Sequence, residues 1–162
     1  MSFAEFLLEN IHNGTLVTFI ISMIPVIELR GAIPFGVASG MSHLSALIVS
    51  VIGNIVPVPF IIIFIRSIFR WMREHMPRLN GLVERLEAKA ESKRGFVAKW
   101  GPYGLIVFVA IPLPGTGAWT GALIAAMLDI RLKSAMPAIS LGVLIAGFIV
   151  TAITYGITGI FA

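Results

Sequence analysis

Glu28 and Arg30 are charged residues set between two apolar runs, residues 15–27 and 32–42, that contain no Asp, Glu, Lys or Arg. An unpaired charge at membrane depth costs roughly 2.5 to 3.5 kcal/mol on insertion scales, so each needs a partner, which can be the other. A carboxylate here can take up and release a proton, while a guanidinium can bind an anion or tune that acidity. We predict proton coupling through Glu28. The alternative is a fixed ion pair that only stabilises the turn.

A second group of residues, between positions 112 and 120, could bind a ligand through backbone N–H groups rather than through charged side chains. Glycines free the backbone N–H groups at the start of the following helix, which is a ready site for phosphate or carboxylate, and nearby hydroxyls and an indole extend it. A tight buried turn made by glycine and proline is the alternative. The predicted site residues here are Pro112, Pro114, Gly115, Thr116, Gly117, Trp119 and Thr120.

Other chemistry is poorly supported. Asn54 lies in an apolar run and fits a helix-to-helix hydrogen bond better than a ligand contact. The chain has no cysteine, and His12, His43 and His75 lie far apart, so we expect no metal and no cofactor. No serine, histidine and aspartate constellation or carboxylate cluster is evident, and we expect no enzyme.

The composition places these residues in a membrane protein. Hydrophobic residues make up 57% of the 162 residues and charged ones 12%, about half the charged share of soluble domains. We expect one all-α membrane domain over residues 1–162. Residues 1–13 have capping-box and helical spacing and predict a short interfacial helix. No basic leader precedes it, so we expect no cleaved signal peptide.

Residues 15–65 form the first predicted repeat. Two half-length apolar runs around a charged break that contains Pro25, Gly31 and Pro34 predict a re-entrant helical hairpin. Residues 44–65 then form a charge-free run long enough to span a bilayer, which Pro57 and Pro59 should kink.

Residues 66–100 form a basic connector. Residues 66–99 hold nine Lys or Arg against four Glu, a net charge of +5, whereas the whole chain carries +4. The positive-inside rule predicts a cytoplasmic connector and a multi-pass protein of the inner or plasma membrane, not a nucleic-acid binder. Pro77 and Gly81 should divide it. We predict a helix lying on the membrane or against the bundle, with an apolar face of Leu79, Leu82, Val83, Leu86 and Ala90.

Residues 101–162 repeat the pattern. Residues 103–111 and 118–128 are the predicted arms of a second hairpin, and residues 135–161 can span with tilt. A shift of about 87 residues lays Pro25 on Pro112 and Gly31 on Ala118. With the connector inside, the hairpins enter from opposite sides, giving two inverted repeats as in many secondary transporters. A plain bundle of four or more spans is the alternative.

ELRGAIP at residues 28–34 and IPLPGTGAWTG at residues 111–121 together resemble the small multi-drug export protein family of prokaryotic membrane proteins. That family is distantly similar to the DedA group, whose VTT domains have paired re-entrant hairpins. The resemblance implies movement of polyprenyl phosphate or other phospholipid carriers, and proton-dependent drug resistance. The DedA group has charges at both turns, whereas the second turn here has none. The matching residues are Glu28, Arg30, Gly31, Pro34, Pro112, Pro114, Gly115, Thr116, Gly117, Trp119 and Gly121.

We therefore predict a small transporter for a lipid-linked anionic substrate, with protons coupled through Glu28. Multidrug efflux is the alternative substrate class, and a lipid-modifying enzyme or an assembly factor is the alternative kind of protein. The expected partners are the lipid bilayer, protons, the anionic lipid or small molecule, and a second copy of the chain in a homodimer, because two hairpins and two spans make a thin bundle.

Overall fold

The computed structural model describes residues 13–113 and 115–161, and every element assigned in them is helical. The predicted interfacial helix over residues 1–13 lies outside the described residues, apart from Asn13. Asn13 itself caps the first described helix, because its side chain accepts a hydrogen bond from the Thr15 N–H at 3.0 Å.

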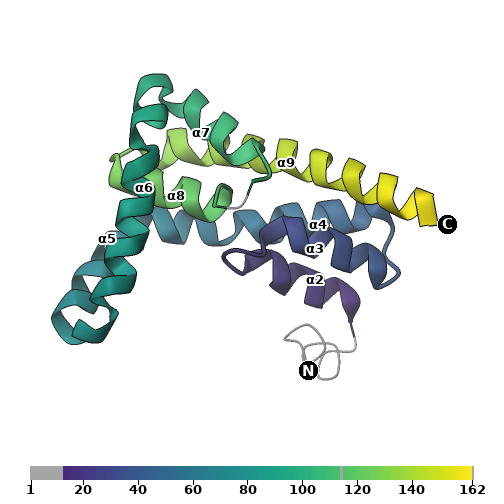
Figure 1. The fold of residues 1–162 in the computed structure, drawn as a ribbon, viewed down its shortest axis with the longest axis horizontal. Coiled ribbons are helices and arrows are strands. Elements are labelled where there is room, and N and C mark those ends of the chain that lie inside the picture. Colours follow the sequence, from purple (N-terminus) through teal and green to yellow (C-terminus); the bar gives the residue numbers. More distant parts are fainter. Residues whose placement is uncertain (1–12, 114, 162) are drawn as a thin grey trace.

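The first helical pair consists of α2 (Gly14–Met23) and α3 (Glu28–Ala38), which lie side by side (Figure 1). The chain reverses over residues 24–27, which we call the first turn. The predicted break contained Pro25, Gly31 and Pro34. Pro25 lies in this turn, whereas Gly31 and Pro34 lie inside α3, so this helix begins earlier than the sequence predicted. The physical reason is that an acidic residue is favoured in the first turn of a helix, while Pro25 disfavours continuation of α2.

A long helical segment follows, made of α4 (His43–Ile55) and α5 (Pro57–His75). Ser42 caps α4 through a hydrogen bond from the Ser45 N–H at 3.2 Å. The helix is interrupted at Val56, just before Pro57, as expected from the proline. It then continues past the predicted end of the span at Ile65, so the first part of the basic connector belongs to α5.

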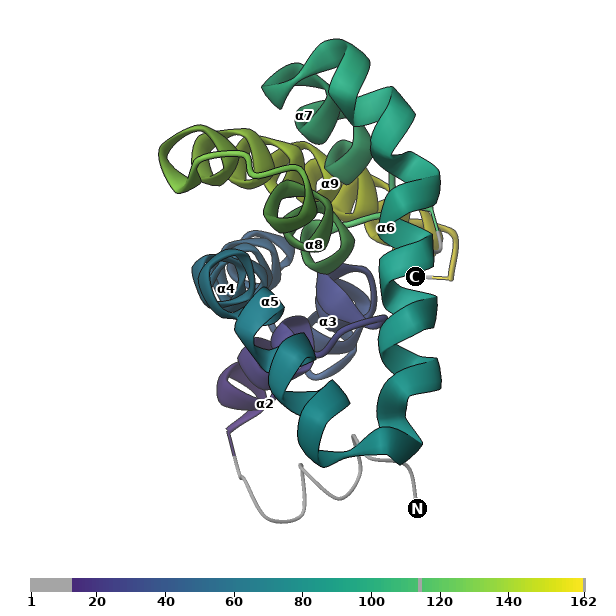
Figure 2. The ribbon, with the colours of Figure 1, turned by 90° about the vertical axis from the view of Figure 1, so that its left-hand side faces the viewer.

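The connector then turns through a short 3-10 helix, η1 (Pro77–Leu79), into α6 (Asn80–Trp100). The break therefore comes at Pro77, while Gly81 lies inside α6. Figure 2 shows α6 crossing one side of the molecule beside α5 and α8. Its buried face consists of Val83, Ala90 and Val97. Leu82 was predicted on this face but is 51% exposed, because it lies one residue away from the buried stripe.

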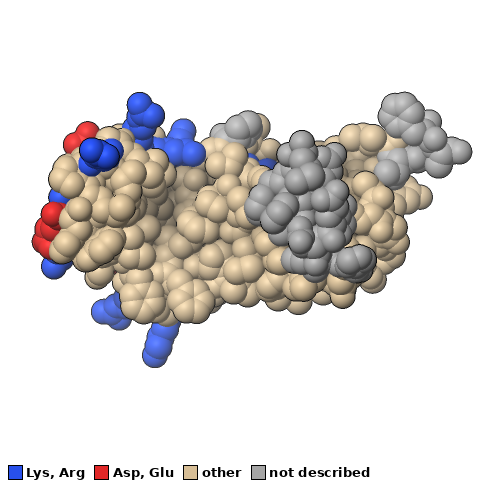
Figure 3. Space-filling model, turned by 90° about the horizontal axis from the view of Figure 1, so that it is seen from below, with Lys and Arg blue, Asp and Glu red and all other residues tan. Residues whose placement is uncertain are grey.

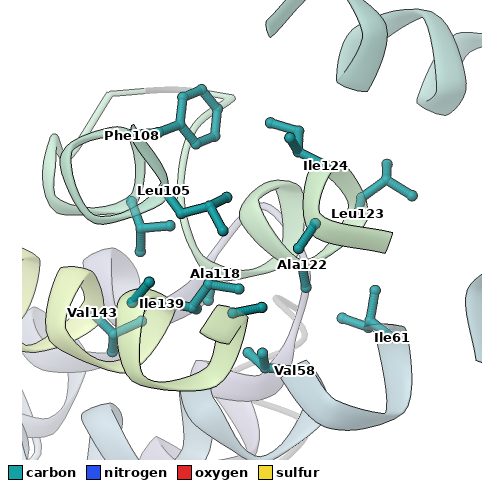
Figure 4. Packing of buried hydrophobic residues seen from close by; sticks show 14 of the residues in the cluster. Val58, Ile61, Leu105, Phe108, Ala118, Ala122, Leu123, Ile124, Ile139 and Val143 are labelled. Atoms are coloured by element: carbon teal, nitrogen blue, oxygen red, sulfur yellow. The ribbon is translucent and has the colours of Figure 1, made fainter. Parts of the chain in front are cut away.

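The second helical pair consists of α7 (Pro102–Ala110) and α8 (Ala118–Met127), followed by α9 (Leu132–Phe161). Residues 111–113 and 115–117 lie between α7 and α8, and we call them the second turn. The predicted close packing of small residues on the last helix occurs at Gly142, where an added Cβ would lie 2.7 Å from the Val109 Cβ. Figure 4 shows the core between these helices, with Leu105, Ile139 and Val143 among its buried side chains.

The outer surface is apolar along most of its length. Figure 3 shows Lys, Arg, Asp and Glu gathered at the end that α5 and α6 form, with uncharged residues over most of the visible face. Large side chains such as Phe60 and Phe148 are each 60% exposed. Two helical segments, His43–His75 and Leu132–Ile157, are long and apolar enough to cross a membrane. These features indicate a membrane location.

Candidate functional site

The two helical pairs meet at the ends next to their turns, and residues of both turns line one cavity. Three side chains connect them. Glu28 and Arg30 reach from α3 to the second turn and the start of α8, and the Trp119 indole N–H donates to the Met23 carbonyl at 3.0 Å. Residues almost ninety positions apart therefore form one site.

Glu28 supplies the N-terminal cap of α8. Its Oε1 accepts a hydrogen bond from the Trp119 backbone N–H at 3.1 Å, and the residue is only 3% exposed. A Cβ built on Gly117 would lie 2.0 Å from Oε2, so the carboxylate needs the space that glycine leaves. A carboxylate is favoured here because a helix N-terminus carries unpaired N–H groups and partial positive charge.

Arg30 binds the second turn itself. Its guanidinium donates to the Leu113 carbonyl and to the Thr116 Oγ1, the latter at 2.8 Å. The same Thr116 oxygen lies 2.7 Å from the Ile111 carbonyl oxygen. Thr116 therefore stabilises the turn and at the same time offers it to Arg30.

This geometry changes two expectations. The sequence predicted that Glu28 and Arg30 need partners, which could be each other. Both side chains instead contact the second turn and the start of α8. Among the described residues the ion pairs are Arg66–Asp129, Arg73–Glu87 and Arg94–Glu91. The N–H groups at the start of α8, predicted as a site for a ligand anion, face the carboxylate of Glu28.

Asn54 lies beside this site and has a buried polar atom without a hydrogen-bond partner among the described residues. It is 1% exposed, and it shares a small internal space with Glu28 and Gly117. Its Oδ1 has no hydrogen-bond partner among the described residues. The expected helix-to-helix hydrogen bond through this oxygen is therefore not formed.

The remaining predicted residues are distributed around the two turns. Gly31 packs against Ile27, whose Cγ2 would lie 2.4 Å from an added Cβ, and Gly121 packs against Val109 in the same way at 2.6 Å. Pro114 lies outside the described residues. The others line one of two cavities: Gly115, Thr116, Trp119 and Thr120 line the first, and Pro34 and Pro112 line the second.

The first cavity, which we call the connector-side cavity, has a volume of about 230 Å³ and lies between the two turns, α5, α6 and α8. Its walls are mainly apolar, with Ile61, Phe69 and Leu123 among them. Lys89 from α6 lines it as well, and its Nζ would lie 3.3 Å from a Cβ on Gly115. Sequence reasoning missed Lys89, although its position next to buried Ala90 indicated that it borders the packed face of α6.

The second cavity, which we call the C-terminal-side cavity, has a volume of about 430 Å³ and lies between α3, the second turn and α9. Val37, Ile153 and Ile157 contribute apolar walls. Arg30 lines this cavity and the connector-side cavity alike. The contact between Arg30 and the second turn therefore stands between two separate hollows.

A further hollow, of about 450 Å³, lies between α5 and α6 away from the turns. Its lining includes Arg66 and Arg73, and these two arginines pair with Asp129 and Glu87. It shares Ile65 and Phe69 with the connector-side cavity, but no residue of either motif lines it, and we therefore place the candidate site at the turns.

Comparison with known proteins identifies the family of the chain. No curated protein and no solved structure matches the chain. A family model matches residues 28–149, a range that begins at Glu28 and includes the whole second turn. The predicted likeness to the DedA group is shown by none of these comparisons. The match covers well over half of the chain, which therefore belongs to the family described as "Putative small multi-drug export protein".

Proposed function

We propose that this protein is a small membrane transporter whose substrate passes the point where the two turns meet. The observation that carries the proposal is the position of Arg30, which binds the second turn and lines the cavities on both sides of it. A transporter needs a site that opens alternately to two sides, and breaking this contact would join the two hollows.

The helical pairs fit two re-entrant hairpins of opposite orientation. In support, α2 and α7 end two residues before Pro25 and Pro112, the prolines that the internal shift aligns. If α4–α5 and α9 span the inner membrane with a cytoplasmic connector, the connector-side cavity opens to the cytoplasm and the C-terminal-side cavity to the outside. Buried irregular backbone at the turns is tolerated because protein surrounds it.

Glu28 is the proposed proton carrier. As a carboxylate it is attracted to the N-terminus of α8, and as a neutral acid it loses most of that attraction. Proton uptake would therefore weaken the contact between the two hairpins and favour their separation. In this way a proton gradient would be coupled to the opening of the site.

The proposed substrate is an anionic, lipid-linked molecule such as a polyprenyl phosphate or a phospholipid. The apolar walls of the connector-side cavity and the cations Arg30 and Lys89 support this choice. Efflux of a cationic drug is the second candidate, which the family description favours. We propose a homodimer, because two long spans leave much apolar surface for a second copy.

Reconstitution into proteoliposomes separates these candidates. Labelled polyprenyl phosphate and a cationic dye are followed with and without a pH gradient. Movement of the unmodified lipid supports transport of an anion, and movement of the dye alone supports drug efflux. A chemically altered lipid supports an enzyme, and no movement of either supports an assembly factor.

Glu28→Gln tests the proposed coupling. The amide keeps the shape of the side chain but cannot release a proton, so we expect transport to fall to the background of empty liposomes with the folded protein recovered intact. Glu84→Gln on exposed α6 is the matched control and should transport as the unmodified chain does. Unchanged, gradient-dependent transport by Glu28→Gln would exclude Glu28 as the carrier.

A further inference from the structure

We infer that Lys89 on α6 is the residue by which the connector-side cavity selects its substrate, an amphiphile with one anionic head and an apolar tail. The inference rests on the proposed function and adds to it a recognition residue from the connector. Neither sequence motif contains Lys89, and the family match by itself assigns it no role.

The first argument for this role is the position of the Lys89 side chain. Its side chain leaves α6, crosses to the second turn and lies over Gly115, where Cε would be 3.2 Å from an added Cβ. Gly115 has a φ of +88°, a conformation that favours glycine, and the absence of a side chain leaves room for the ammonium group. Within the described residues Lys89 makes no ion pair, unlike Arg66, Arg73 and Arg94.

The second argument is the arrangement of charged side chains in the cavity. Glu28 and Arg30 also line it, but Glu28 faces the N-terminus of α8 and Arg30 donates to the Leu113 carbonyl and Thr116. Lys89 interacts electrostatically with Glu28, but among the described residues no ion pair holds its ammonium group, which can therefore bind a ligand. Thr120 lines the same cavity and adds a hydroxyl. An ammonium beside a hydroxyl recognises a phosphate or carboxylate oxygen.

The third argument is the apolar lining of the connector-side cavity. Ile61, Ile65 and Phe69 from α5 and Leu86 from α6 line the cavity with hydrocarbon. Burial of an alkyl chain against them contributes about 0.8 kcal/mol for each CH₂ group. A free inorganic anion would gain nothing from these walls, so the tail distinguishes an amphiphile from phosphate. A cationic amphiphile would instead be repelled by Lys89 and Arg30.

Tryptophan quenching provides the test. Trp119 lines the cavity, whereas Trp71 and Trp100 are 53% and 57% exposed, so Trp71→Phe and Trp100→Phe leave one reporter. The full chain in phosphatidylcholine vesicles is titrated with 12-bromododecyl phosphate, 12-bromododecyltrimethylammonium and inorganic phosphate. Lys89→Gln is compared with Lys93→Gln, one helical turn further along α6, and all variants must share the melting temperature of the background.

We expect the bromododecyl phosphate to quench Trp119, and Lys89→Gln to raise its half-quenching concentration about tenfold, as for loss of a charged hydrogen-bond partner. Lys93→Gln should stay within about twofold, and Lys89→Glu should favour the trimethylammonium probe. Equal affinities of the Lys89 and Lys93 variants, or displacement of the probe by equimolar inorganic phosphate, would overturn the inference. Absence of transport despite this binding pattern would instead count against the proposed function alone.

Discussion

Glu28 and Arg30 contact the backbone of the second helical pair and its turn, and this determines what their replacement should do. Glu28 accepts a hydrogen bond from the Trp119 backbone N–H, and Arg30 donates one to the Leu113 carbonyl, which also accepts from Thr116. Such contacts contribute about 1.5 to 3 kcal/mol each. The two residues therefore combine a structural role, joining the hairpins, with the proposed functional one.

A substitution of Asn54 should separate an effect on transport from an effect on stability. A buried amide oxygen without a hydrogen bond lowers stability, and an apolar residue of similar shape removes that cost. We expect Asn54→Leu to keep or raise the free energy of unfolding, by up to about 1 kcal/mol, while transport falls, because the polar neighbour of Glu28 is lost. Thermal unfolding in detergent and transport in proteoliposomes measure the two effects. A large loss of stability would mean that the amide is part of the packed core.

At the residue scale, the sequence could identify most of the site but not its partners. Glu28, Arg30 and Thr116 stand out because polar groups are rare in apolar runs. Their mutual contacts could not be predicted, because they depend on how two distant turns pack. Lys89 could not be predicted as a site residue, because it is one of nine basic residues in the connector and only tertiary structure distinguishes it from its neighbours.

At the scale of elements, α8 depends on a cap supplied by another helix. Gly117 precedes it with a φ of +114° and has no side chain to cap it, so Glu28 from α3 provides the carboxylate. The start of α8 and the start of α3 are therefore coupled. Removal of the cap should loosen the second turn before it affects the long helices α4 and α9.

Gly117→Ala tests this coupling. The added methyl group would meet the Glu28 carboxylate, and the positive φ disfavours any other residue. We expect the free energy of unfolding to fall by about 2 to 3 kcal/mol. Gly95→Ala in α6 is the control: nothing lies within 4 Å of its added Cβ, and helix propensity should raise stability by up to about 1 kcal/mol. Equal melting temperatures for both variants would contradict the proposed cap.

The ends of the helices could be predicted where proline and glycine residues mark them clearly. The ends of α7 and α8 lie within one residue of their predicted positions, because Pro102, Pro112 and Gly117 leave few alternatives. The start of α3 was predicted too late, because the charges of Glu28 and Arg30 suggested a break in the helix. In fact the charge of Glu28 suits a helix N-terminus, and both side chains find partners across the molecule.

At the scale of the whole molecule, the contact between Arg30 and the second turn lies between two cavities. The all-helical class and the two long apolar segments could be predicted from composition and run length. The contact between the two helical pairs could not, since hydrophobicity does not specify which helices pack together. The two cavities also depend on side-chain packing, which the sequence pattern does not specify.

Accessibility to a thiol reagent tests this arrangement most directly, and the absence of native cysteine makes single-cysteine variants simple to interpret. Leu86→Cys lines the connector-side cavity and Ala38→Cys the C-terminal-side cavity. A membrane-impermeant maleimide is applied to intact cells and to inside-out vesicles. We predict labelling of Ala38→Cys from the outside only and of Leu86→Cys from the cytoplasmic side only. Labelling of both from the same side would contradict two cavities that face opposite sides of the membrane.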